Sequence, residues 1–244
     1  FHAVTTGQDL SLQKEIWPFV ATSVLGLSLY YYGTLSALRR GNLSVYYPII
    51  RSSPIAIVVF SWLAMDRSYS WLTIAGIFTV LLGSFMIQKT PGSILEDQKA
   101  FALAIIAMLG SAAYSISDAG AMQFTTPAVY LFYTNISVTV LLLGIQRWES
   151  RLNTLSFGEV AQQWMRAPWR IMLAGVSSYL SYFFILRAFQ LGAEAAAVSA
   201  LRQASIPVSI LLAAIILLEP SFLKNIAWAN LILLGILLIT LSTL

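Results

Sequence analysis

Residues 48–54 read PIIRSSP, and residues 202–207 read RQASIP, so each stretch places an arginine ahead of a proline among apolar residues. Proline interrupts a helix because it has no backbone N–H and its ring clashes with the carbonyl four residues earlier. A charged side chain at bilayer depth is costly and usually faces a cavity or a partner. The two stretches, with arginines 151 positions apart, indicate a repeated membrane-embedded element.

The composition is that of a membrane protein. Hydrophobic residues make up 58% of the 244-residue chain, charged residues make up 10%, and the mean hydropathy is +0.78, whereas a soluble domain has about 25% charged residues. A helix needs about 20 apolar residues to cross a bilayer, and backbone groups in lipid must be satisfied within the span. We expect an all-α polytopic membrane helix bundle with transmembrane helices at residues 16–38, 43–65, 70–88, 100–123, 127–146, 169–190, 194–218 and 225–244.

Several functional classes are excluded by the residues that the chain lacks. It has no cysteine and a single histidine, His2, which excludes thiolate metal sites, cysteine nucleophiles and a serine–histidine triad. It has no nucleotide-binding motif and no basic stripe for nucleic acid. We therefore expect no enzyme activity, no metal, no cofactor, no nucleic-acid partner and no direct use of ATP.

The two arginine stretches belong to a longer internal repeat. An ordered set of residues recurs at offsets of 151 to 153: Gly41 with Gly192, Arg51 with Arg202, Pro54 with Pro207, Asp66 with Glu219, and Gly83 with Gly235. Three spans of each unit match, and two further spans, in 100–146, begin the second unit. Five helices per unit is an odd number, so successive units have opposite orientations, as in many secondary transporters. The full protein is expected to have ten helices, two of them upstream of Phe1.

With this pattern the chain resembles the EamA-type transporters of the drug/metabolite transporter superfamily. The resemblance rests on two turns, Ala37–Gly41 and Arg187–Gly192, each followed by the repeated proline, acid and glycine. It implies two inverted five-helix repeats, with residues 1–92 ending the first and residues 98–244 forming the second. It also implies a multi-pass protein of the bacterial inner membrane, and a first helix that contributes to the central cavity, so the chain without that helix is not expected to transport.

The arginines are the first candidates for a solute site. A guanidinium group pairs well with carboxylate or phosphate, so Arg51 and Arg202 would bind an anionic or zwitterionic solute, with Pro54 and Pro207 as hinges. Alternatively, each arginine satisfies freed carbonyls and an internal acid, and holds the bundle together. The candidate acid is Asp118, which pairs with an arginine (Arg51, Arg187 or Arg202), carries a coupling proton, or lies at the interface with little effect.

Tyrosines in the spans are the other polar candidates. Buried tyrosine hydroxyls need partners, so some of them should line a wet cavity, although packing and interfacial belts account for at least half of such residues. The candidate contacts are Tyr31, Tyr47, Tyr114, Tyr179 and Tyr182, together with Gln203 beside Arg202.

The connection at residues 147–168 is long and contains a capping-box pattern, Ser156 to Glu159, before an apolar face. It is either a short helix in the membrane interface or a solvated loop. The positive-inside rule places this connection and the others rich in Lys and Arg in the cytoplasm, which puts Leu244 outside. The family resemblance implies cytoplasmic termini, so the orientation stays open.

These observations predict a secondary carrier that works by alternating access and exports small metabolites, amino acids or amphipathic compounds. Its partners would be the lipid bilayer and the solute, and it would act as a monomer or homodimer. The alternatives are a subunit of a lipid-linked sugar flippase, which needs a cavity open to lipid, and a non-transporting membrane scaffold.

Overall fold

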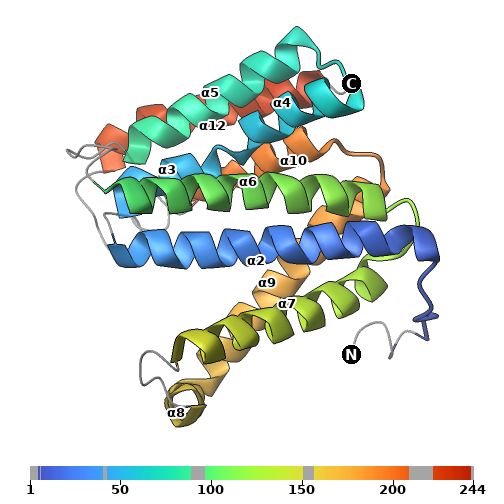
Figure 1. The fold of residues 1–244 in the computed structure, drawn as a ribbon. Coiled ribbons are helices and arrows are strands. Elements are labelled where there is room, and N and C mark those ends of the chain that lie inside the picture. Colours follow the sequence, from blue (N-terminus) through green and yellow to red (C-terminus); the bar gives the residue numbers. More distant parts are fainter. Residues whose placement is uncertain are drawn as a thin grey trace.

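A computed structural model describes Thr5 and residues 7–40, 43–88, 97–150, 157–208 and 222–242, and every regular element in these residues is a helix (Figure 1). The elements are η1 (Lys14–Ile16), α2 (Trp17–Arg40), α3 (Leu43–Arg51), α4 (Ser53–Met65), α5 (Trp71–Gln88), α6 (Gln98–Ala121), α7 (Pro127–Ser150), α8 (Phe157–Arg166), α9 (Pro168–Gln190), α10 (Ala195–Leu201), η2 (Arg202–Ala204) and α12 (Phe222–Leu241).

The all-helical bundle expected from the sequence is confirmed. Four segments are long and apolar enough to cross a membrane, namely Tyr46–Met65, Gln98–Ala121, Pro127–Ile145 and Pro168–Gln190, and two shorter apolar helices cover Trp71–Met86 and Ile226–Leu241. The span expected at 43–65 is two helices, α3 and α4, and the span expected at 194–218 begins as α10 and η2 and extends beyond the described residues. The total of eight spans stays a prediction.

Two closely packed helix pairs form the frame of the bundle. α2 lies antiparallel to α6, and α5 lies against α12, with α4 and α10 between the two pairs (Figure 1). Glycines permit both close approaches: a Cβ atom at Gly26 would lie 2.8 Å from the carbonyl oxygen of Gly110, and one at Gly76 would lie 2.8 Å from that of Gly235. Small residues at membrane helix contacts allow backbones to approach in this way.

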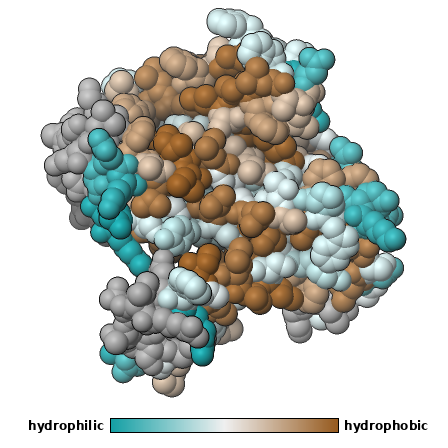
Figure 2. Space-filling view, in the orientation of Figure 1, coloured by the Kyte–Doolittle hydropathy of each residue, from teal (hydrophilic) through white to brown (hydrophobic). Residues whose placement is uncertain are grey.

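The outer surface suits lipid over most of its width. Figure 2 shows apolar residues spread over the bundle and hydrophilic residues concentrated toward its ends. Large apolar side chains point outward from α5, α9 and α12, such as Phe78, Phe184 and Leu237, which are 65%, 66% and 54% exposed. In water such exposure would be unfavourable, whereas in a bilayer it is expected.

The helix α9 is far more exposed than its repeat counterpart α2. Gly26 and Gly33 of α2 are buried against α6, whereas the residues 151 positions later, Ser177 and Phe184 of α9, are exposed. The same face of a repeated helix is therefore packed in one copy and open in the other.

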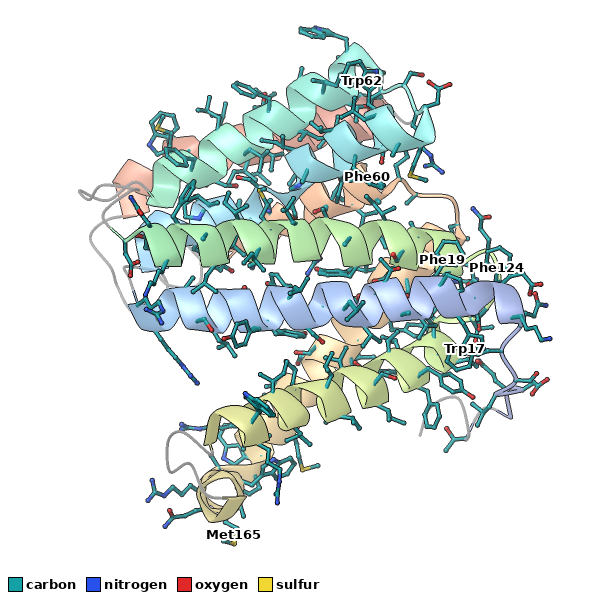
Figure 3. The ribbon with its side chains drawn as sticks, in the orientation of Figure 1. Trp17, Phe19, Phe60, Trp62, Phe124 and Met165 are labelled. Atoms are coloured by element: carbon teal, nitrogen blue, oxygen red, sulfur yellow. The ribbon has the colours of Figure 1, made fainter. Side chains whose placement is uncertain are left out.

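Basic residues lie at the two ends of the bundle, where the predicted spans end. Arg40 and Lys99 lie at the end where α2 stops and α6 begins, the end that also bears α8, whereas Arg67 and Arg187 lie at the opposite end (Figure 1). Residues 157–166 of the long connection form a helix, α8, on which Trp164 and Met165 are 50% and 77% exposed; Met165 projects from this helix in Figure 3. The orientation in the membrane stays a prediction, and Lys89, Arg151 and Glu219 fall outside the described residues.

Candidate functional site

Both arginine-bearing helices break at the arginine itself. α3 ends at Arg51 and α4 begins at Ser53, with the Ser52 amide donating to the carbonyl of Ile49, 3.0 Å away. α10 ends before Arg202, which opens the 3-10 turn η2, and residues 205–208 are helical again. The breaks expected at Pro54 and Pro207 therefore start a few residues earlier, because Pro54 sits in the first turn of α4, where its missing N–H costs nothing.

The two breaks contact each other directly. The Gln203 side-chain amide donates to the carbonyl oxygen of Arg51 over 3.0 Å, and the hydroxyls of Ser53 and Ser199 lie 3.1 Å apart. Gln203 is 2% exposed, and its Oε1 atom has no hydrogen-bond partner among the described residues. The freed Arg51 carbonyl is thus satisfied by the other repeat, which leaves one buried acceptor between the breaks.

Each arginine is held by a tyrosine. Arg51 Nε donates to the Tyr47 hydroxyl over 2.9 Å, with its guanidinium carbon 5.0 Å from the centre of that ring. Arg202 Nη1 donates to the Tyr114 hydroxyl over 2.5 Å, 5.8 Å from the ring centre. Both arginines are half-buried, and neither is paired with a carboxylate among the described residues. Two cations are therefore oriented by neutral groups and remain uncompensated.

Tyr30 of α2 joins the two pairs. Its ring meets that of Tyr114 edge-on at 5.9 Å, and it lies within electrostatic range of both guanidinium groups. The neighbouring Tyr31 is tilted against it at 5.4 Å and is 44% exposed. We name the group formed by Arg51, Tyr47, Tyr30, Tyr114 and Arg202 the arginine–tyrosine cluster.

Asp118 forms a separate buried site. Its side chain is 0% exposed, and Oδ1 accepts hydrogen bonds from Ser23 at 2.6 Å and Tyr130 at 2.8 Å, while Oδ2 accepts one from Tyr182. The ion pair considered for it is not formed among the described residues, because its partners are hydroxyls, and Arg187 donates to Gln190 instead. The carboxyl is enclosed by neighbouring helices, one turn before the end of α6, and the position at the membrane interface considered for Asp118 stays a prediction.

The candidate tyrosines divide between the two sites. Tyr182 bonds Asp118 and lies 6.3 Å from the Tyr114 ring, so it touches both the acid and the cluster. Tyr179 stacks on Phe183 at 6.3 Å instead. Ser23 and Tyr130 were not predicted as site residues, because only the fold shows that α2 and α7 present these hydroxyls to Asp118.

Two hollows flank these groups. An apolar groove of about 730 Å³ lies between α2 and α7, lined by Leu25, Tyr32 and Trp148 among others. A more polar hollow of about 410 Å³ lies at the bundle end where α2 begins, near Phe19 and Phe124, which stack at 5.7 Å (Figure 3). Neither hollow is lined by Arg51 or Arg202. The described residues also hold no group of three acids or histidines suited to a metal ion.

Comparisons with known proteins agree with this architecture. Residues 1–88 match the model of the EamA-like transporter family, and no curated protein matches the chain. Sixteen chains of solved structures match, among them a crystal structure that is 18% identical, with a TM-score of 0.74 over 98% of this chain and 81% of its own. At that identity the likeness shows the fold alone. The family match agrees with the resemblance drawn from the sequence: residues 1–88 are similar to the EamA-like transporter family, and the all-helical bundle is consistent with a membrane transporter of that type.

Proposed function

We propose that the protein is a secondary carrier that exports small anionic or zwitterionic metabolites, with the arginine–tyrosine cluster as its solute site. The observation that carries the proposal is the pair of uncompensated guanidinium groups at the contacting breaks of two repeat-related helices. A buried charge without a counterion is unfavourable, and an anionic solute would supply that counterion while it is bound.

The hydrogen bonds in the cluster support an anion site. Each tyrosine hydroxyl accepts from a guanidinium group and fixes its direction, yet each guanidinium has five N–H donors, most of which remain for a carboxylate or phosphate. The orphaned Oε1 atom of Gln203 would accept from an ammonium or hydroxyl group on the same solute. That combination favours a zwitterion or a hydroxylated acid over a simple anion.

The contact between the two breaks supports alternating access. Irregular backbone at membrane depth is tolerated where it lines a cavity or is buried in protein, and broken helices at a repeat interface are where transporters place their sites. The polar contacts that join the breaks, from Gln203 to Arg51 and between Ser53 and Ser199, are few, so one repeat can rock against the other around them. The hinges proposed at Pro54 and Pro207 lie on the far side of each break.

We further propose that the protein lies in a bacterial inner membrane as a monomer or homodimer and has no catalytic role. A flippase role gains no support from the comparisons, and a passive scaffold leaves the two unpaired arginines without a function.

The test is metabolite export from cells that express the gene encoding this chain. Wild type, Arg202→Gln and the control Arg187→Gln, an exposed arginine at the bundle end, are compared at equal membrane abundance. We expect one class of acidic or zwitterionic metabolites to accumulate in the medium with wild type and Arg187→Gln and to fall to the empty-vector level with Arg202→Gln. Equal export by all three proteins would overturn the site, and export by none would overturn the function.

A further inference from the structure

We propose that Asp118 is the binding site for the coupling proton of this carrier, and that Tyr182 carries the effect of protonation to helix α9 and to the arginine–tyrosine cluster. The inference rests on the proposed function for its coupling role, but the proton site stands on its own geometry.

The surroundings of the carboxyl are those of a site that can exchange a proton. Three neutral hydroxyls, from Ser23, Tyr130 and Tyr182, donate to its two oxygens, and the side chain is 0% exposed. An ionised carboxylate accepts all three bonds, whereas the acid has a proton of its own to donate and accepts more weakly. No fixed cation forms an ion pair with the carboxyl among the described residues, and the ionised form is held mainly by the three hydroxyl groups.

The titratable groups that face Asp118 can be named helix by helix. α7 contributes Tyr130, α9 contributes Tyr182, and η2 contributes Arg202 at longer range. Tyr114, one turn earlier on α6, packs against Tyr182. α2 presents only Ser23, and α10 contains no ionisable residue. Arg202 is bonded to Tyr114 rather than to the carboxyl, so it influences Asp118 only through space.

Protonation has a mechanical consequence because the four groups come from four helices. Ser23, Asp118, Tyr130 and Tyr182 belong to α2, α6, α7 and α9, respectively. Charge-assisted hydrogen bonds are roughly twice as strong as neutral ones, so uptake of a proton weakens the tie between α9 and α6. α9 is also largely exposed, with 6% of its most apolar segment buried, and its buried contacts gather around Leu186 and Phe189.

A contiguous chain of contacts links the proton site to the solute site. Tyr182 bonds Asp118 and packs against the Tyr114 ring at 6.3 Å, and the Tyr114 hydroxyl accepts from Arg202. A solute anion that draws Arg202 away would free Tyr114 and shift Tyr182, while a proton on Asp118 would do so from the other side. Proton and solute thereby bias the same pair of tyrosines, which is the physical requirement for coupling between two sites.

The proton also has a route. The polar hollow of about 410 Å³ is lined by Ala119 and Gly120, the residues that follow Asp118 on α6, and by the polar side chains of Arg67, Gln123 and Gln190 at the bundle end. The hollow therefore adjoins the segment of α6 that bears the carboxyl, and an opening at this segment would connect the two.

The direct test is infrared difference spectroscopy of the purified protein in lipid nanodiscs as the pH is lowered, which needs no knowledge of the solute. We expect the C=O stretching band of a water-shielded protonated carboxyl to appear in wild type and to be lost in Asp118→Asn. The control is Asp66→Asn, which changes an exposed acid whose left-handed backbone, at φ 51°, asparagine tolerates; it should keep the band. A band that survives in Asp118→Asn, or a wild type without a titrating band, overturns the proposal.

A second measurement tests the link to α9. The chain has no cysteine, so spin labels can be placed at Leu173→Cys on α9 and Leu35→Cys on α2, both exposed positions. We expect the distance between the labels to lengthen or broaden at low pH in wild type and to be independent of pH in Asp118→Asn. A pH-independent distance in both would refute the mechanical role. The infrared result and the export assay test the two proposals separately. A titrating band without export would support the proton site and contradict the carrier function. Export without a titrating band would support the carrier function and contradict the proton site.

Discussion

The contact between α2 and α6 should be intolerant of a single added methyl group at Gly110. A Cβ atom there would lie 2.6 Å from the carbonyl oxygen of Gly26 and 2.9 Å from the amide nitrogen of Tyr30. Both are backbone atoms, so no side chain can rotate away. To reach the 3.4 Å at which ordinary contact begins, the two helices must separate by about 0.8 Å, which weakens dispersion contacts along the interface.

The matched control for Gly110→Ala is Gly144→Ala, in the interior of α7, where a Cβ atom meets nothing within 4 Å. Both substitutions gain about 1 kcal/mol of helix propensity, so their difference isolates the clash. Overpacking of this kind costs about 1–3 kcal/mol, which corresponds to roughly 2–12 °C in melting temperature for a chain of this size.

The assay is thermal unfolding of both purified variants in the same detergent, followed by the fluorescence of the seven tryptophans. Gly110→Ala should melt below Gly144→Ala by several degrees, and its export should fall as well, because Tyr30 and Tyr114 of the cluster sit at this interface. If Gly110→Ala melts at or above Gly144→Ala, the helices are not in the close contact described, and the reasoning fails.

Two further changes test the site. Tyr114→Phe keeps the ring but removes the acceptor for Arg202, so the KM for the exported solute should rise severalfold with a smaller change in kcat; an unchanged KM would contradict the orienting role. Gln203→Glu replaces the amide that donates to the Arg51 carbonyl with a carboxylate at the contact between the two breaks, and should abolish export of an anion, with folding checked by size-exclusion chromatography; continued export by the folded variant would contradict an anion site there.

The fold was predictable from the sequence because lipid imposes simple rules. Apolar runs of fixed length must be helices, and the repeat of glycine, arginine, proline and acid set their order. The nearby prolines predicted that the helices would break close to Arg51 and Arg202, but they did not predict the residue at which each break begins. That residue depends on how Gln203 of one repeat satisfies the Arg51 carbonyl of the other, a contact between segments about 150 residues apart.

The site was predictable only in part. Arginine at membrane depth is rare enough to mark a site by itself, and Tyr47 follows because it lies one helical turn from Arg51. The environment of Asp118 was not predictable, since its three donors come from three other helices and nothing in the residues around Ser23 or Tyr130 points to an acid. An acid and an arginine within apolar spans suggested an ion pair. The packing of α2, α7 and α9 around Asp118 instead surrounds its carboxyl with hydroxyl groups.

The central claim is that the two arginines bind the anionic group of a solute, and the most direct measurement is a thermal-stability screen of the purified protein. A panel of small carboxylates, phosphates and amino acids is compared with neutral amides of the same size, on wild type, Arg202→Gln and Arg187→Gln. The account predicts that ligands bearing an anionic group raise the melting temperature of wild type and Arg187→Gln, that their neutral amides do not, and that the shift disappears in Arg202→Gln. Stabilisation by the neutral amides, or an undiminished shift in Arg202→Gln, would contradict it.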